Sequence, residues 1–186
     1  MYKEFFNNFL EKHEEKSKVI CIDGVVGVGK STFSEILSKE LNIELYQEPV
    51  LNNPLLDKFY HDKKRYSFPL QIFFLNKRFQ MIQEALTKGN CLMDRSIYGD
   101  IIFSKMLYLD GDMTKEEFNV YQELLETMLK LVKRPNLMIY LKSSVDKAIE
   151  KIERRGRDYE LEVPKEYWES LNFHYEAYMR EYNLSN

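Results

Sequence analysis

The sequence, 186 residues long, is poor in the residues that build metal and disulfide sites. It contains two cysteines and three histidines, whose positions do not match the ligand spacings of zinc sites. We therefore predict no metal held by histidine or thiolate. Cys21 and Cys91 each fall inside a predicted buried strand, which favours small core residues over a disulfide.

Long apolar runs and an excess of one charge are also missing. No run approaches the ~20 apolar residues of a membrane-spanning helix, and Met1–Lys18 lacks the pattern of a secretory signal. Lysine and arginine number 27 against 30 acidic residues, a net charge of -3, whereas surfaces that bind nucleic acid are strongly basic. We expect a cytoplasmic protein with no membrane or nucleic-acid partner.

What the chain does have suits one α/β domain over residues 1–186, since 44% of its residues are hydrophobic and 31% charged. The N-terminal segment 1–18 has the pattern of an amphipathic helix, which we expect to pack on that domain as an extension. One face of this helix would carry Phe5, Phe6, Phe9 and Leu10.

The most informative stretch is Gly24–Ser31, which reads GVVGVGKS and fits the P-loop pattern G-x-x-x-x-G-K-[ST]. It follows the apolar run Val19–Ile22 and precedes a helix-compatible run, Thr32–Leu41. This strand–turn–helix setting favours a phosphate site over a plain glycine-rich turn, because backbone N–H groups and a helix N-terminus converge on one point. The predicted cofactor-binding residues are Gly24, Gly27, Gly29, Lys30, Ser31 and Thr32.

In such a loop, Lys30 would reach the terminal phosphates of a nucleotide such as ATP, and the Ser31 hydroxyl would ligate Mg²⁺.

Short apolar strands and amphipathic helices alternate along the rest of the chain, which predicts a doubly wound parallel sheet with helices on both faces. The predicted strands are 19–22, 43–46, 91–93 and 137–141. The predicted helices are 32–41, 54–60, 68–87, 97–108, 114–133, 145–154 and 165–182, and the charged segment 154–160 is predicted to be a loop.

Ligands of such sheets bind at the carboxyl ends of the strands. Glu48 follows the second predicted strand, and Asp94 and Arg95 follow the third. At that edge Glu48 can accept the proton of an attacking hydroxyl, Asp94 can bind Mg²⁺ or its waters, and Arg95 can stabilise charge on the transferred group. Elsewhere these residues would be solvated surface charges, but their place after buried strands favours catalysis.

Two further features allow both a functional and a structural interpretation. The cluster Arg154–Arg157 can belong to a mobile lid over residues 154–160 that closes on nucleotide phosphates, or it can complement a helix dipole. The upstream P-loop favours the lid. Gln71, among apolar neighbours on a helix, can read the edge of a nucleobase, although a lone helical glutamine usually faces solvent.

Taken together, these residues make the chain resemble the deoxyribonucleoside kinase family, and within it the bacterial deoxyadenosine/deoxyguanosine kinases. The shared motifs run in order over about residues 19–182, nearly the whole chain. They are the P-loop, Gln47–Val50, Asn53–Tyr60, Gln71–Phe79, Asp94–Asp100 and Arg155–Glu160. The Asp-Arg-Ser triplet at 94–96, in place of the Asp-Arg-Tyr typical of thymidylate kinases, points to a nucleoside acceptor.

The resemblance implies a P-loop kinase three-layer fold. It also implies Mg²⁺-dependent transfer of the γ-phosphate of ATP, or of another nucleoside triphosphate, to the 5′-hydroxyl of a deoxynucleoside for dNTP salvage, a purine and especially deoxyadenosine being favoured. It implies catalytic roles for Lys30, for Glu48 as the base and for Arg95 as its electrostatic partner. It also implies a homodimer built on the helical segments 68–87 and 97–131.

The resemblance further assigns binding roles to residues outside the P-loop. The sugar 3′-hydroxyl would bind Tyr60 and Glu160, the base would bind Gln71, and the donor phosphates would bind Arg155 and Arg157. Arg78 and Asp100 would also contact the base, as in members that accept purines and cytosine. Buried together, however, these two residues can equally form a structural ion pair.

The chain departs from the family at both ends. Family members usually continue past the last helix into a fifth strand and a loop that holds the donor adenine, whereas this sequence stops at Asn186. We therefore expect either a truncated chain or a donor pocket that is built differently. Bacterial members usually begin near the first strand, so the extension 1–18 is the second departure.

Two other functions compete with the kinase interpretation. A non-catalytic nucleotide-binding relative, acting as a structural or regulatory subunit, is disfavoured because Lys30, Glu48, Asp94 and Arg95 are all present. A nucleoside monophosphate kinase would need a second basic phosphate site near the acceptor, and the sequence offers no spare cluster for one.

Overall fold

The computed structural model describes residues 2–11, 17–50 and 53–184. At its centre is a four-stranded sheet in the order β2-β3-β1-β4, and each neighbouring pair is parallel. Both central strands, β1 and β3, are buried along their whole length, as parallel strands covered on both faces must be. The strands are β1 (Val19–Asp23), β2 (Glu44–Tyr46), β3 (Cys91–Asp94) and β4 (Leu137–Tyr140).

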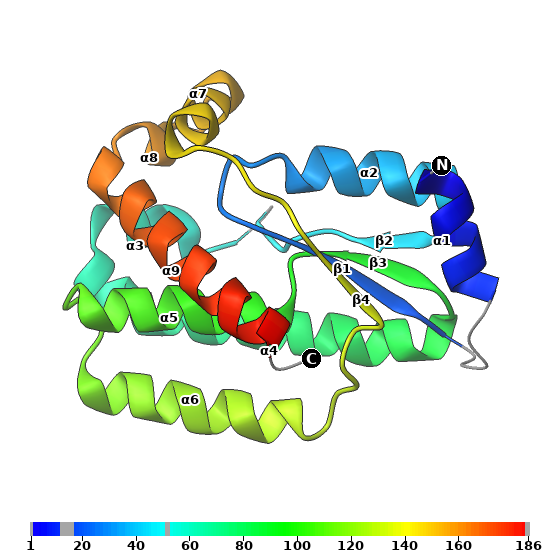
Figure 1. The fold of residues 1–186 in the computed structure, drawn as a ribbon. Coiled ribbons are helices and arrows are strands. Elements are labelled where there is room, and N and C mark those ends of the chain that lie inside the picture. The colour runs from blue at the N-terminus through cyan, green and yellow to red at the C-terminus, as the bar shows by residue number, and fades with distance from the viewer. Residues whose placement is uncertain (1, 12–16, 51–52, 185–186) are drawn as a thin grey trace.

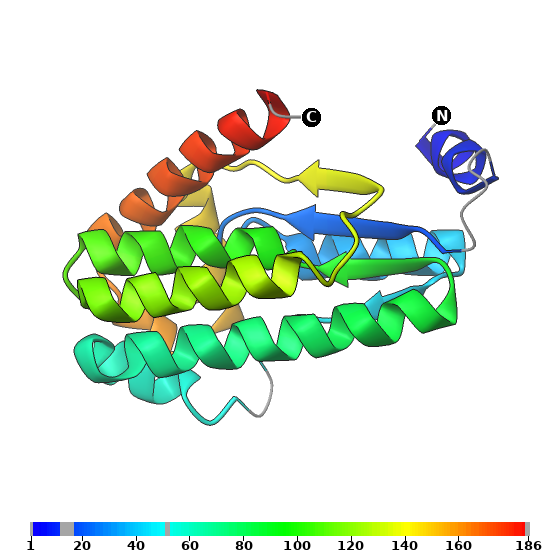
Figure 2. The same ribbon diagram turned by 90° about the horizontal axis from the view of Figure 1, so that it is seen from below.

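Helices cover both faces of this sheet and give the predicted three-layer α/β fold (Figures 1 and 2). On one side lies α2, with α1 near its end, and on the other side lie α4, α5, α6 and α9. The helices are α1 (Tyr2–Glu11), α2 (Lys30–Leu41), α3 (Leu56–His61), α4 (Lys63–Lys88), the 3₁₀ turn η1 (Ile97–Gly99), α5 (Asp100–Leu109), α6 (Lys115–Leu129), α7 (Val145–Arg155), α8 (Asp158–Leu161) and α9 (Lys165–Leu184).

The alternation of side chains along β1 explains the two layers. Ile20 and Ile22 pack in one cluster with Leu37 of α2 and Phe6 of α1, whereas Cys21 belongs to the larger cluster on the opposite face. Both cysteines are free and buried. The sheet therefore separates the core into two clusters, one on each face, and several buried charged side chains, including Asp23, Asp94 and Arg95, lie where the strands end.

The N-terminal helix packs against the α2 side of the sheet. Within it Phe6 is buried, Phe5 remains exposed, and Phe9 stacks on Phe5 with ring centroids 6.4 Å apart. Lys18 donates a hydrogen bond to the carbonyl of Leu10. The middle of the expected extension, residues 12–16, lies outside the described part of the chain. Within the described ranges, no helix combines the length and the apolar character needed to cross a membrane.

Helix boundaries differ from the sequence expectation in several places. Helix α4 begins at Lys63 rather than at residue 68, because Asp62 caps it by accepting a hydrogen bond from the Arg65 N–H at 3.2 Å. The helix continues through Pro69, which removes only one backbone donor. Apolar periodicity alone placed the start too late, since the first turn is charged.

The charged segment 154–160 is not the loop that the sequence predicted. Helix α7 extends to Arg155, and Gly156, with a φ of 67°, ends it by donating its N–H to the carbonyl of Ile152 at 3.1 Å. A further helical turn, α8, follows from Asp158. Helix α6 begins with a capping box formed by Thr114 and Glu117, and it ends at Leu129 rather than near residue 133.

Candidate active site

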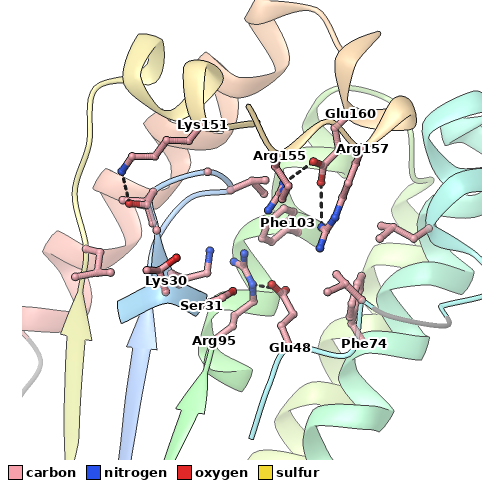
Figure 3. A pocket seen from close by; sticks show the side chains of 18 of the residues that line it. Lys30, Ser31, Glu48, Phe74, Arg95, Phe103, Lys151, Arg155, Arg157 and Glu160 are labelled. Carbon is pink, nitrogen blue, oxygen red and sulfur yellow. Dashed lines mark hydrogen bonds and ion pairs between the residues drawn. The ribbon is translucent and has the colours of Figure 1, made fainter. Parts of the chain in front are cut away.

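A cavity of about 900 Å³ opens at the carboxyl ends of the strands. Figure 3 shows that Lys30, Ser31, Glu48 and Arg95 lie on its floor, while Arg155 at the end of α7 and Arg157 before α8 approach from the opposite side. Apolar walls come from α4 and α5, including Phe74 and Phe103. An amphipathic cavity with a few converging polar groups is typical of a small-molecule site.

The P-loop glycines hold backbone conformations that other residues rarely adopt. Gly24, Gly27 and Gly29 have φ values of 146°, 79° and 108°. A Cβ on Gly27 would lie 2.4 Å from the carbonyl oxygen of Ala148, so α7 packs directly on the loop. The loop therefore tolerates only glycine there, both for its φ and for this close approach.

Lys30 is buried at the start of α2 and is 6% exposed. Its Nζ donates a hydrogen bond to the carbonyl of Val25 at 2.9 Å. Burial, together with the positive charge of Arg95, lowers the pKa of Lys30 to about 8. An ammonium group in this position is poorly solvated, and phosphate oxygens would add to the counter-charge of Glu48, Asp94 and Asp23.

Ser31 and Asp94 form a pair of oxygen ligands beside the loop. The Ser31 hydroxyl donates to Asp94 Oδ2 at 2.6 Å, and burial raises the pKa of Asp94. Oδ1 of this buried carboxylate has no hydrogen-bond partner among the residues that the structure describes. These two side chains fit Mg²⁺, which takes few protein ligands and completes its octahedron with waters and substrate phosphates.

Glu48 accepts hydrogen bonds from two buried arginines through one oxygen. Arg95 Nε lies 2.5 Å and Arg78 Nη2 lies 3.2 Å from Glu48 Oε1. Burial alone would raise the pKa of Glu48, but Arg95 and Arg78 outweigh it and hold this pKa well below its usual range. The carboxylate is therefore ionised at any physiological pH.

Arg78 also forms an ion pair with Asp100, which is one of the two interpretations that the sequence left open for these residues. Arg78 Nε donates to both carboxylate oxygens of Asp100, at 2.7 and 2.8 Å, and burial raises the pKa of Asp100 to about 6. The same guanidinium reaches Glu48, so it links α4 to the segment after β2. Gln71 lies on the same wall and is 3% exposed, which makes it part of the cavity lining rather than a solvent-facing residue.

Two of the three arginines in the segment 154–160 converge on one buried carboxylate. Arg155 donates to Glu160, and Arg157 Nη1 lies 3.4 Å from Glu160 Oε1, as the dashed lines of Figure 3 mark. The ring of Tyr60 in α3 stacks on Tyr159 with centroids 5.3 Å apart. All four predicted residues of this group, including Tyr60, line the same cavity as the P-loop.

Known proteins resemble this chain along most of its length. A family model described as deoxynucleoside kinase matches residues 20–186. The chain belongs to the deoxynucleoside kinase family. It is 40% identical over 177 residues to deoxyadenosine/deoxycytidine kinase of Bacillus subtilis (strain 168), covering 93% of this chain and 82% of that protein. It is 39% identical to deoxyguanosine kinase of Lactobacillus acidophilus, covering 90% of this chain and 77% of that protein.

Solved structures of a deoxynucleoside kinase have the same fold. Deoxyadenosine kinase from M. mycoides with the products dCMP and a flexible dCDP gives a TM-score of 0.82 at 36% identity, covering 88% of this chain and 84% of that chain. The same kinase with dATP gives a TM-score of 0.81. The predicted fold class and enzyme class are thus confirmed, and the protein transfers a phosphoryl group to a deoxynucleoside.

Sequence reasoning missed several residues of this deoxynucleoside kinase site. Lys151 Nζ in α7 donates to the P-loop carbonyl of Val28 at 2.9 Å. Its spacing of one helical turn before Arg155 could have indicated it. Asp23 and Tyr175 are buried behind Arg95. Asp23 follows the predicted strand 19–22 just as Asp94 follows its own strand, so the same rule could have indicated it. Tyr175 carried no usable signal, because a tyrosine inside an amphipathic helix resembles an ordinary core position.

Proposed function

We propose that this deoxynucleoside kinase transfers the γ-phosphoryl group of ATP, or of another nucleoside triphosphate, to the 5′-hydroxyl of a purine deoxynucleoside, with deoxyadenosine preferred. One observation carries the proposal. A single cavity is lined by the P-loop residues Val26–Ser31, whose Ser31 donates to Asp94, and by the ionised Glu48, which accepts hydrogen bonds from Arg95 and Arg78. Donor and acceptor groups would meet between the P-loop and Glu48.

The donor half would be held by the P-loop and by the lid residues 154–160. Backbone N–H groups of the loop and Lys30 would bind the phosphates of ATP, and Ser31 and Asp94 would hold Mg²⁺. The bound ion would neutralise charge on the phosphates. Arg155 and Arg157 would approach from α7 and α8 on the opposite side of the cavity, and their closure would exclude water.

The acceptor half would be organised around Glu48. Both arginines donate to Oε1, so Oε2 is the oxygen that we assign to the proton of the 5′-hydroxyl. A carboxylate with a lowered pKa is a weak base, but phosphoryl transfer has a loose transition state that demands little proton removal before the bond to phosphorus forms. Glu48 would therefore act mainly by orienting the hydroxyl.

Selectivity for a purine rests on the polar residues of the opposite wall. Gln71 can donate to and accept from one edge of a base, and Arg78 and Asp100 provide a second polar contact behind it. Tyr60 and Glu160 would bind the sugar. The names of the relatives support a purine substrate, since one is a deoxyguanosine kinase and the other a kinase of deoxyadenosine, which is named for deoxycytidine as well. The non-catalytic alternative is disfavoured, because every predicted catalytic side chain faces the cavity.

A screen of the four natural deoxynucleosides with ATP and Mg²⁺ tests the proposal. We expect 5′-monophosphate product from deoxyadenosine at the highest kcat/KM, with at least about tenfold less from thymidine, the usual size of a selectivity based on one or two hydrogen bonds. Chelation of the metal should abolish turnover in every case. Absence of product from all four nucleosides would contradict the kinase function, and a preference for thymidine would contradict only the purine assignment.

We also propose that the protein is a cytoplasmic homodimer that associates through α4, α5 and α6. Val120 of α6 is 54% exposed and Leu131, just beyond this helix, is 65% exposed, so this face carries apolar side chains that a partner subunit could cover. Analytical ultracentrifugation should give about twice the monomer mass, and Val120→Glu should shift the equilibrium to monomer. A wild-type protein that sediments as a monomer at micromolar concentration would contradict this assembly.

A further inference from the structure

Arg95 has a backbone conformation that needs support from its surroundings. Its φ is 80°, in the left-handed region that residues other than glycine and asparagine rarely adopt. The Arg95 N–H donates to the carbonyl of Ile22 at 2.8 Å, and the side chain is 2% exposed. Such a conformation persists only where neighbouring groups determine it, and these groups lie behind the arginine.

The supporting groups are Tyr175 of α9 and Asp23 at the end of β1, both fully buried. Arg95 Nη1 donates to the Tyr175 hydroxyl, and that hydroxyl donates to Asp23 Oδ1 at 3.1 Å. Asp23 Oδ1 also lies 3.8 Å from Arg95 Nη1. The Tyr175 hydroxyl therefore accepts a hydrogen bond from Arg95 and donates its single proton to the Asp23 carboxylate.

Asp23 connects the P-loop to the turn that carries Arg95. Its Oδ1 accepts the N–H of Gly24, the first P-loop residue, at 2.8 Å. Its Oδ2 accepts from the Ser96 hydroxyl and from the Ser96 N–H at 3.2 Å. One carboxylate therefore joins the start of the phosphate loop to the turn that carries Arg95.

Aromatic packing restricts the remaining freedom of the guanidinium. It lies 5.0 Å from the ring centroid of Phe103, and the Tyr175 ring stacks on Tyr140 at 6.3 Å with an interplanar angle of 5°. A Cβ on Gly99 would lie 2.8 Å from Asp23 Oδ2, so the space around the carboxylate is filled. The tyrosine cannot move without disturbing several neighbours.

We infer that Tyr175 and Asp23 are positioning residues for Arg95. They hold Nη1, while Glu48 binds Nε, and this leaves Nη2 for the transferred phosphoryl group. Nη2 has no hydrogen-bond partner in the described part of the chain. The inference rests on the proposed role of Arg95. It adds that Tyr175, from α9, fixes the orientation of the guanidinium group.

Tyr175→Phe tests this inference with the loss of one oxygen atom. Because hydrogen bonds to charged groups are the stronger ones, we expect kcat for deoxyadenosine to fall about tenfold to a hundredfold. The KM values for nucleoside and ATP should stay within about twofold, since neither substrate would touch the tyrosine. Steady-state kinetics measure both quantities, and Tyr178→Phe, one turn further along α9, serves as the matched control.

A double-mutant cycle separates positioning from a general structural role. When Arg95 is replaced by Ala, single-turnover assays should show no further loss from Tyr175→Phe. An equal loss in both backgrounds would overturn the inference, as would wild-type kcat in the Tyr175→Phe variant. Asp23→Asn provides a second route to the same loss of kcat should Tyr175→Phe fold poorly. An inactive wild-type protein would instead contradict the proposed function itself.

Discussion

Glu48→Gln should reduce turnover by roughly a hundredfold to ten thousandfold, the range attributed to a positioned acid–base group. The amide keeps the shape of the side chain, and its oxygen can still accept a hydrogen bond from Arg95. It cannot accept the hydroxyl proton, however, and its oxygen carries no charge to orient the nucleophile. Steady-state kinetics with deoxyadenosine measure kcat, and calorimetric titration measures nucleoside affinity, which should change little.

This substitution also removes the anion shared by two buried arginines, so a loss of folding must be separated from a loss of chemistry. Arg78 keeps Asp100, and Arg95 keeps Tyr175 and Asp23. We therefore expect a lower melting temperature but a folded protein. Glu44→Gln is the matched control, because Glu44 lies on the preceding strand, is exposed and pairs only weakly with Lys88. Unchanged turnover of Glu48→Gln would contradict the assignment of Glu48 to the 5′-hydroxyl of the nucleoside.

Lys30→Ala should have an effect of similar size on the donor side, with kcat/KM for ATP falling about a thousandfold. The lysine is buried at the point where the γ-phosphate would accumulate charge, and the truncated side chain cannot replace that contact. Thermal stability should not fall, because burial opposes the charged form of Lys30. Lys39→Ala, an exposed position in the same helix, is the control. A fully active Lys30→Ala variant would overturn the P-loop interpretation.

The lowered pKa of Lys30 adds a pH-dependent readout to the same residue. In the free protein its pKa is about 8, below the ordinary 10.5, so the lysine loses its proton as the pH rises past 8. Bound phosphates favour the ammonium and raise this pKa. ATP binding at pH 9 should therefore take up close to one proton, and ATP affinity should fall by up to about tenfold per pH unit above 8.

Calorimetry in two buffers of different ionisation enthalpy measures that proton uptake. The uptake should be small at pH 7, where Lys30 is already protonated, and it should disappear in Lys30→Met at pH 9. A proton uptake that persists in Lys30→Met would assign it to another group.

The relation of sequence to site follows from how far apart the cooperating residues lie. The P-loop could be identified from eight consecutive residues, since its function depends on a local turn between one strand and one helix. Glu48, Asp94 and Arg95 could be placed because a parallel sheet collects the ends of its strands at one edge. Local patterns failed for the start of α4 and for the segment 154–160, where single caps at Asp62 and Gly156 decide the boundaries.

By itself, the sequence determined the fold class, the phosphate loop and the edge of the sheet where chemistry takes place, because these follow from hydrophobic periodicity and contiguous motifs. Only the tertiary structure decided that Arg78 and Arg95 both donate to Glu48. It also decided that the Tyr175 hydroxyl lies between Arg95 and Asp23, although Tyr175 and Asp23 are 152 residues apart in the sequence. Such contacts depend on how α4 and α9 pack against the sheet. A side chain's partners across that packing are set by three-dimensional proximity, which one-dimensional spacing does not encode.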